Sequence, residues 1–183
     1  PYHTLYDPMC GSGTILIEGA MMVHNIAPGV NRYFSAERWD VIDEKIWADE
    51  RNRARDLVNY DTDFIAYGSD IDEDAIEIAK INAKRAGVER KIKFEKADIR
   101  NFEPKSEKGT VICNPPYGER LLDIEEAQKL YKIMGEKFIR KHGWSYYVIS
   151  PSEEFEKEFG RKADKRRKLY NGMIKCQLFM YFK

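Results

Sequence analysis

Short apolar runs of strand length alternate with helical patterns along most of this chain. A strand, helix, strand order at this rhythm implies right-handed crossovers and a parallel sheet. The expected strands are 3–7, 63–70, 91–98, 109–114 and 144–150, and the expected helices are 14 to about 25, about 74–86 and about 125–141. The alternation therefore predicts an α/β fold.

Two segments depart from this alternation. Residues 26–59 form a long insertion after the first helix, and its pattern predicts an ordered loop followed by a charged amphipathic helix. Residues 165–182 contain two strand-like runs around Asn171-Gly172, a typical hairpin pair because a type I′ turn needs positive φ at both central positions. We therefore expect a mostly parallel sheet with an antiparallel C-terminal hairpin.

Length and composition are those of one ordinary domain. The chain has 183 residues, 43% of them hydrophobic, which predicts a single domain over residues 1–183. Its 31 basic and 31 acidic residues balance, so a nucleic-acid partner would have to be bound by local patches. The sequence has no membrane-spanning run and no signal segment, which favours a cytoplasmic protein without a membrane partner. Because the chain starts at Pro1, close to the first strand, we expect a fragment that lacks upstream sequence.

The three cysteines, Cys10, Cys113 and Cys176, are scattered along the chain. They form no CxxC pair and have no histidine-rich neighbourhood, which is typical of reduced intracellular cysteines and predicts no metal site. Cys10 has no His/Asp pair beside it in the sequence. We therefore interpret Cys10 as a small residue that fills space in its turn, and not as a nucleophile.

The stretch LYDPMCGSGT, residues 5–14, passes from an apolar strand through a glycine-rich turn into an apolar helix. Gly11 and Gly13 allow positive φ and a close approach of the backbone to a ligand, and the helix that follows directs free N–H groups toward it. The spacing matches neither the G-x-G-x-x-G dinucleotide turn nor a P-loop, since Gly19 comes too late and no Lys-Ser/Thr follows. The turn suits a ligand that carries an adenosine but no pyrophosphate.

Three carboxylates, Asp7, Asp70 and Asp98, stand at the carboxyl ends of successive expected strands. In an open α/β sheet this edge forms the ligand crevice. Asp70 can accept hydrogen bonds from both hydroxyls of a ribose, Asp98 from an adenine amino group, and Asp7 from the ammonium of an amino acid. Together the three side chains predict S-adenosylmethionine as the cofactor.

The stretch NPPYGER, residues 114–120, follows the fourth expected strand. Its prolines offer no N–H groups, so the Asn114 amide and nearby carbonyls are free to bind another molecule. Asn114 Oδ1 and the Pro115 carbonyl can accept both hydrogens of a planar amino group, and Tyr117 offers a ring on which a base or amide can stack. The motif therefore predicts a substrate with an amino group.

The motifs DPMCGSGT, GSDID, KADIRNF and NPPYG, in this order, resemble those of class I S-adenosylmethionine-dependent methyltransferases that act on exocyclic or amide nitrogen. More narrowly, DPMCGSGTILIEGA, NIAPGVNRYFSAERW, NPPYGERL and KLYNG resemble the methyltransferase domain of the THUMP-associated RNA guanine-N2 methyltransferases. That family includes the bacterial large-subunit ribosomal RNA enzyme and carries an upstream THUMP region, which this chain lacks. The resemblance implies a Rossmann-like catalytic domain that methylates guanine N2 of RNA, with 23S rRNA as the expected substrate.

The same resemblance assigns the site residues. Asp7, Gly11 and Gly13 would contact the methionine end of the cofactor, Asp70 its ribose, and Asp98 its adenine amino group. The expected cofactor-binding residues are Asp7, Pro8, Cys10, Gly11, Gly13, Thr14, Asp70, Ile71, Asp98, Ile99 and Asn114. The expected catalytic residues, which would hold the guanine amino group, are Asn114, Pro115 and Tyr117.

Other functions stay open on the sequence. The RNA substrate could be tRNA, and Asn-Pro-Pro-Tyr motifs also serve methylation of DNA adenine N6 and of protein glutamine. An RNA-binding module without activity is a further alternative, against which the intact motif and the acidic series argue. The basic run 160–168 could contact phosphates or could be an ordinary solvated surface. We interpret Trp39 and Trp47 as packing residues of the insertion.

Overall fold

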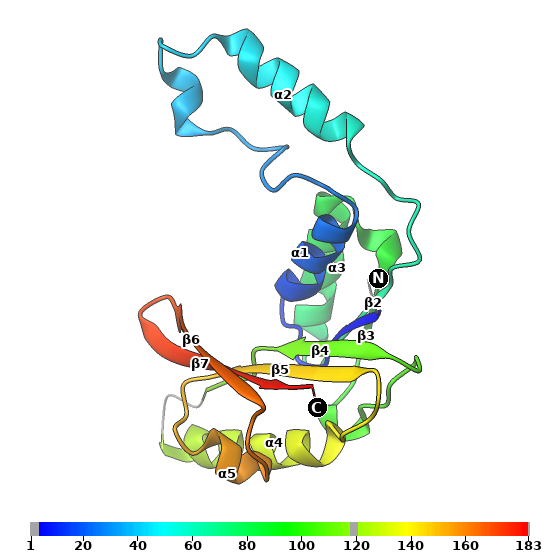
Figure 1. Ribbon diagram of the computed structural model, residues 1–183, viewed down its shortest axis with the longest axis vertical. Coiled ribbons are helices and arrows are strands. Elements are labelled where there is room, and N and C mark those ends of the chain that lie inside the picture. The colour runs from blue at the N-terminus through cyan, green and yellow to red at the C-terminus, as the bar shows by residue number, and fades with distance from the viewer. Residues whose placement is uncertain (1–3, 118–120, 183) are drawn as a thin grey trace.

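A computed structural model of the chain describes residues 4–117 and 121–182. Its strands are β1 (Thr4–Asp7), β2 (Ala66–Asp70), β3 (Ile92–Lys96), β4 (Gly109–Cys113), β5 (Trp144–Ser150), β6 (Lys165–Asn171) and β7 (Ile174–Tyr181). They form one sheet in the order β3-β2-β1-β4-β5-β7-β6. Strands β1 to β5 pair in parallel, whereas β7 runs antiparallel to both β5 and β6 (Figure 1). This arrangement confirms the predicted Rossmann-like α/β fold with an antiparallel C-terminal hairpin.

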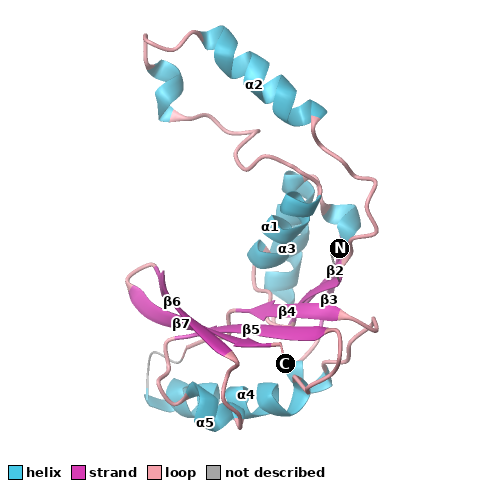
Figure 2. Cartoon of the chain, in the orientation of Figure 1, coloured by secondary structure: helices cyan, strands magenta, loops and turns pink. Residues whose placement is uncertain are grey.

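Helices cover both faces of the sheet (Figure 2). The helices are α1 (Thr14–Val23), α2 (Glu44–Asp56), α3 (Glu73–Ala86), α4 (Leu121–Lys137) and α5 (Phe155–Phe159). On one face, buried side chains of α1 and α3, such as Leu16 and Ile76, pack with Leu5 and Ala66 of the sheet. On the other face, buried side chains of α4 and α5 pack with those of β4, β5 and β7. The sheet is therefore the middle layer of a three-layer fold.

The connections create a switch point between β1 and β4. After β1 the chain builds β2 and β3 on one side, and it then returns to add β4 and β5 on the other side. In open α/β sheets the crevice outside the carboxyl ends of the strands at such a point is the usual ligand site. Asp7 ends β1 and Asn114 follows β4, so two predicted site residues lie at the strand ends on either side of this switch point.

The insertion extends away from the sheet and carries α2 (Figure 1). None of the α2 side chains is buried. Its local contacts are a stacked pair of Phe34 and Trp47 rings, 5.9 Å apart, and an ion pair between Glu37 and Arg51 at 2.5 Å. The packing role predicted for Trp47 is confirmed, but the one predicted for Trp39 is wrong, because this side chain is 60% exposed.

The C-terminal hairpin turns one residue later than predicted. Asn171 pairs with Ile174, so the central positions of the turn are Gly172 and Met173, not Asn171 and Gly172. Gly172 has a φ of 59°, whereas Met173 is not among the residues with positive φ. A glycine at the first central position alone is the pattern of a type II′ turn and not of the predicted type I′ turn.

Two helix boundaries also differ from the prediction. The first helix ends at Val23 instead of near Asn25, because Asn25 adopts a left-handed φ of 55°. The helix predicted over about 125–141 runs from Leu121 to Lys137, and the chain then bends through Gly143, with a φ of 83°, to enter β5. Among the described helices, none has the length and apolar character needed to cross a bilayer.

Candidate functional site

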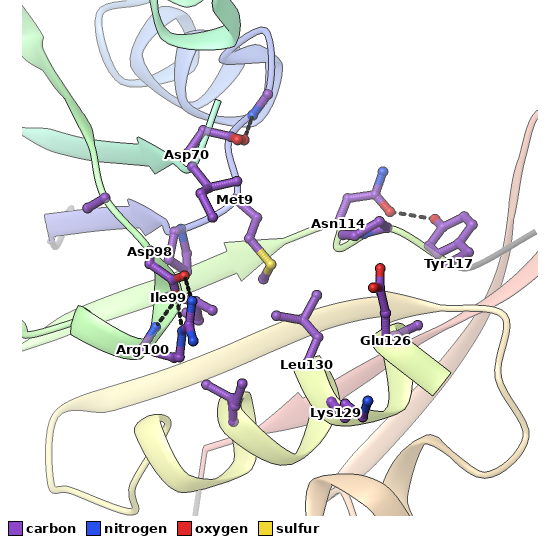
Figure 3. A pocket seen from close by; sticks show the side chains of 17 residues that line it. Met9, Asp70, Asp98, Ile99, Arg100, Asn114, Tyr117, Glu126, Lys129 and Leu130 are labelled. Carbon is purple, nitrogen blue, oxygen red and sulfur yellow. Dashed lines mark hydrogen bonds and ion pairs between the residues drawn. The ribbon is translucent and has the colours of Figure 1, made fainter. Parts of the chain in front are cut away.

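A cavity of about 1200 Å³ opens at the carboxyl ends of β1, β2 and β4, and residues of α4 form its far wall (Figure 3). It coincides with the switch point between β1 and β4. The predicted site residues that line it are Pro8, Gly11, Asp70, Ile71, Asp98, Ile99, Asn114 and Tyr117. Segments far apart in the sequence therefore meet at one cavity.

The glycine-rich turn is held against the end of β2. The Gly11 N–H donates to Asp70 Oδ2 at 2.9 Å, and the Cys10 N–H donates to the Ser69 carbonyl at 2.9 Å. Gly11 has a φ of 50°, and a Cβ added there would meet no heavy atom within 4 Å. Because this open space borders the cavity, a ligand can approach the backbone at Gly11 in a way that a side chain would prevent.

Gly13 has a different role from Gly11. It precedes α1 with a φ of 82°, and a Cβ there would lie 3.1 Å from Ala79 Cβ and 3.1 Å from Phe94 Cζ. Gly13 does not line the cavity, and neither does Thr14, the first residue of α1. Gly13 is thus required for packing of the turn against α3 and β3.

Asp70 is fixed at the edge of the cavity by two backbone donors. Its Oδ2 accepts from the Gly11 N–H, and its Oδ1 accepts from the Asp72 N–H at 3.1 Å. Each carboxylate oxygen can accept a further hydrogen bond, so both remain available to a vicinal diol. Ile71 lies beside Asp70 with a side chain that is 65% exposed, and the cavity therefore offers an apolar surface next to this carboxylate.

Asp98 is held by the neighbouring Arg100. Its Oδ1 accepts from the Arg100 N–H at 2.8 Å and from Arg100 Nε at 3.0 Å, and its Oδ2 accepts from Arg100 Nη2 at 2.6 Å. These side-chain and backbone hydrogen bonds lower the pKa of Asp98 below its ordinary value. Asp98 therefore stays ionised and can accept a hydrogen bond from an amino group in the cavity.

Asp7 lies behind the wall of the cavity. Only 2% of the residue is exposed, and its Oδ1 accepts from the Met9 N–H at 3.2 Å. Burial, reinforced by the nearby charge of Asp70, raises the pKa of Asp7 to about 7. Asp7 does not line the cavity in this structure, so its predicted contact with the methionine end of a cofactor remains a prediction.

The Asn-Pro-Pro-Tyr segment forms its own hydrogen-bonded unit at the end of the cavity. The Tyr117 hydroxyl donates to Asn114 Oδ1 and accepts from Asn171 Nδ2 at 3.2 Å and from the Cys176 thiol at 3.7 Å. Burial raises the pKa of Tyr117 to about 12, so its hydroxyl stays protonated. Pro115 is fully buried and does not line the cavity.

Cys10 is buried behind the turn and also does not line the cavity. Burial and the charges of Asp7 and Asp70 raise the pKa of the Cys10 thiol to about 12. The thiolate is the reactive form of cysteine. A protonated, buried thiol agrees with the interpretation of Cys10 as a residue that fills space.

The far wall contains residues that the sequence analysis missed. Residues of α4 line the cavity, and the Glu126 carboxylate points toward Asn114 and Tyr117 (Figure 3). The residues that line the cavity but were not predicted as site residues are Met9, Ala97, Arg100, Pro116, Glu126, Ala127, Lys129, Leu130 and Ile133. The pattern of α4 predicted a helix, but it could not indicate which of its side chains meet the ends of β1 and β4. In the part of the chain that the structure describes, no group of three or more His, Cys, Asp or Glu could hold a metal ion.

The geometry agrees with comparisons to known proteins. Residues 1–179 match the protein family described as RMKL-like, methyltransferase domain. The chain is 42% identical over 182 residues to YpsC of Bacillus subtilis (strain 168), whose name proposes an RNA methyltransferase. It is 40% identical over 183 residues to the ribosomal RNA large subunit methyltransferase K/L of Shewanella sp. (strain W3-18-1). These matches cover 100% and 97% of the chain but only 47% and 26% of the two relatives, so the chain spans at most about half of their length.

Two solved structures share the fold closely. One is SMU.472 in complex with SAH, with 43% identity and a TM-score of 0.92 over 100% of this chain and 48% of that chain. The other is a protein from Listeria monocytogenes str. 4b F2365 named as a predicted N6-adenine-specific DNA methylase, with 47% identity and a TM-score of 0.90 over 98% of this chain and 46% of that chain. This chain therefore shares its fold with SMU.472, whose structure contains bound SAH.

Proposed function

The chain belongs to the RMKL-like methyltransferase domain family and is an S-adenosylmethionine-dependent methyltransferase domain, and we propose that it methylates guanine N2 in 23S rRNA. One observation carries the proposal. Asn114 and Tyr117 lie on the same cavity as Gly11 and Asp70, so an amino-binding motif and the candidate cofactor residues share one space. An RNA substrate of this kind is found in the cytoplasm, which is the proposed location.

The residues of the strand ends fit the cofactor. We expect the Asp70 carboxylate to bind the ribose hydroxyls and Asp98 the adenine amino group, because both side chains are exposed to the cavity with acceptor capacity left. Ile71 and Ile99 supply apolar surface for the adenine ring. The open space at Gly11 suits the close approach of the methionine portion to the backbone.

The substrate amino group is expected to bind at Asn114. In the structure Asn114 Oδ1 accepts from the Tyr117 hydroxyl, and its second lone pair can accept from an entering amino group. Tyr117 can then keep its bonds to Asn171 and Cys176 while its ring stacks on the base. Base stacking on an aromatic ring contributes roughly 1–3 kcal/mol.

The chemistry consists mainly of alignment. S-adenosylmethionine, when bound, supplies a methyl group already activated by its sulfonium. The lone pair of the exocyclic nitrogen is delocalised into the ring, and a hydrogen bond from the amino group to Asn114 Oδ1 favours a pyramidal nitrogen. This nitrogen would form the new N–C bond while the bond between the methyl carbon and the sulfur breaks and its electron pair stays on the sulfur. The spare proton of the methylated nitrogen leaves to water or to a neighbouring acceptor. Orientation of this kind can lower a barrier by roughly 7–11 kcal/mol.

The position of Glu126 favours guanine over adenine. Its carboxylate points from α4 toward Asn114 and Tyr117 (Figure 3). A carboxylate is an acceptor, and guanine presents an N1–H donor next to its N2 amino group, whereas adenine presents an N1 acceptor next to N6. The Glu126 carboxylate would therefore accept from the first edge, whereas the second edge offers it only another acceptor at N1.

RNA is favoured over other substrates by the relatives. The names of YpsC and of methyltransferase K/L both point to RNA, and the latter names the large ribosomal subunit. The name of the Listeria protein points to DNA adenine, which makes DNA the second candidate substrate. Transfer RNA and protein glutamine are the remaining alternatives for an Asn-Pro-Pro-Tyr site.

The decisive experiment is deletion of the gene in its host, followed by mass spectrometry of nucleosides from separated ribosomal and transfer RNA and from DNA. Loss of N2-methylguanosine from 23S rRNA, restored by the wild-type gene but not by N114A, is the expected result. Loss of N2-methylguanosine from tRNA alone would identify tRNA as the substrate. Unchanged RNA with loss of N6-methyladenine from DNA would refute the proposal.

A further inference from the structure

The β6–β7 hairpin carries an unusual concentration of positive charge. Residues 165–182 contain five cationic side chains and no carboxylate, although the whole chain has equal numbers of both. The cationic residues are Lys165, Arg166, Arg167, Lys168 and Lys175, and all five are exposed. This hairpin is therefore the obvious surface on which a polyanion could bind.

The cations are divided between the two faces of the hairpin. Successive side chains of a strand point to opposite faces, so Lys165 and Arg167 share a face with Asn171. Lys168 lies on the opposite face, which it shares with Lys175 because Lys168 pairs with Gln177 and Tyr170 with Lys175. The two faces thus differ in their relation to the candidate site.

In the described part of the chain, the first face alone is connected to the Asn-Pro-Pro-Tyr segment. Asn171 donates to the Tyr117 hydroxyl at 3.2 Å, and Cys176, which pairs with Leu169 on this face, contacts the same hydroxyl at 3.7 Å. A strand of RNA that lies along Lys165 and Arg167 therefore reaches Asn171 and, beside it, the ring of Tyr117. The seven residues of β6 span about 23 Å, which is enough for several nucleotides.

The charges on this face are not used within the protein. Among the described residues, the side chains of Lys165 and Arg167 have no hydrogen-bond or ion-pair partner, whereas the Arg166 side chain pairs with Glu156. β6 is an edge strand, and charged side chains protect edge strands from pairing with other chains. Lysine in particular serves this protection, so what distinguishes this face as a binding surface is its direct connection through Asn171 to Tyr117.

We propose that the face of the β6–β7 hairpin formed by Lys165, Arg167 and Asn171 binds the RNA strand next to the target nucleotide. Lys165 and Arg167 contact its phosphates, and Asn171 connects the bound strand to the tyrosine on which the target base stacks. This inference rests on the proposed function, since it assumes RNA as the substrate. It adds a binding surface on this chain that lies outside the cavity.

The test compares the two faces by charge-matched double variants. The intact protein and its variants K165Q/R167Q and K168Q/K175Q are titrated against a fluorescein-labelled, unstructured single-stranded RNA of about twelve nucleotides between 50 and 300 mM salt. Each double variant removes two positive charges from exposed positions, so it should fold normally, which circular dichroism and thermal unfolding can verify. Methylation of RNA and binding of S-adenosylmethionine are measured on the same samples.

K165Q/R167Q is expected to lower RNA affinity about tenfold at low salt and to reduce the slope of log K against log salt by about 1.4, because each single-strand phosphate contact contributes about 0.7. Its KM for RNA should rise while S-adenosylmethionine affinity is unchanged. K168Q/K175Q should behave as wild type. Equal losses in both variants, or a loss in neither, would overturn the face-specific proposal.

The same samples separate this inference from the proposed function. If the wild-type protein methylates RNA and K165Q/R167Q binds RNA as wild type does, only the hairpin surface is refuted. If the wild-type protein neither binds nor methylates RNA, the proposed function fails and the hairpin proposal fails with it.

Discussion

The Tyr117 hydroxyl donates a hydrogen bond to Asn114 Oδ1, so one candidate substrate-binding side chain uses one of the two lone pairs of the other. The bond closes the Asn-Pro-Pro-Tyr segment on itself. Because an amide oxygen has two lone pairs, Asn114 Oδ1 can accept from an amino group while the Tyr117 hydroxyl stays in place, held also by Asn171 and Cys176.

This relationship predicts different effects of two substitutions. Tyr117→Phe keeps the ring and removes only the hydroxyl that donates to Asn114 Oδ1, so kcat should stay within about threefold of wild type. Asn114→Ala removes the acceptor that orients the amino group and should lower kcat by about 100-fold, a loss typical of small misalignments of reacting groups. Steady-state kinetics with S-adenosylmethionine and RNA check both. An Asn114→Ala enzyme with wild-type kcat would contradict the mechanism.

Substitution of Glu126 is expected to change how strongly the site binds the guanine base. Glu126→Gln should raise KM for the guanine substrate, because the neutral amide binds the guanine edge less strongly than a carboxylate does. Glu125→Gln is the matched control, since Glu125 is its exposed neighbour on α4 and does not line the cavity. Isothermal titration should find unchanged S-adenosylmethionine affinity in both variants. Equal KM values for the two variants would refute a role of Glu126 in base recognition.

Substitutions of Gly11 and Gly13 should have different effects, the first mainly on cofactor binding and the second mainly on the stability of the fold. Gly11→Ala adds a methyl group in open space beside the cavity at a φ of 50°, so it should cost only about 1 kcal/mol of backbone strain and in addition weaken S-adenosylmethionine binding. Gly13→Ala adds one within 3.1 Å of Ala79 and Phe94 at a φ of 82°, and should lower the free energy of unfolding by about 1–3 kcal/mol. Calorimetric titration and urea unfolding measure the two effects. The reverse pattern would contradict the assigned roles.

Asp7 predicts a pH dependence of stability. Its pKa is raised to about 7 in the folded protein, so the stability it contributes is fully present below the unfolded pKa of about 4 and is lost as pH rises through 7. Relative to wild type, Asp7→Asn should therefore gain stability between pH 5 and pH 8, by about 2–3 kcal/mol at about 1.4 kcal/mol per pKa unit. Urea unfolding of both proteins at the two pH values provides the measurement. A constant difference between them would show that Asp7 does not titrate in this range.

The sequence alone determined the order and type of the elements and the residues that end the strands. These are local features. Hydrophobic periodicity, the turn around Gly11 and Gly13 and the carboxylates at the strand ends each depend only on residues that are neighbours in the sequence. These features predicted the fold, and they also indicated Asp70, Asp98 and Asn114, which line the cavity. Local patterns can carry this information because they set backbone conformation residue by residue.

Only the tertiary structure decided which distant side chains meet. It brings Glu126 of α4 to the ends of β1 and β4, joins Asn171 to Tyr117, and buries Asp7 behind the cavity wall. It also places the hairpin turn at Gly172 and Met173, one residue later than the sequence predicted. These outcomes depend on the packing of whole helices and strands and on the register of β6 against β7. A one-residue change of register reverses the face of every side chain, which no local pattern determines.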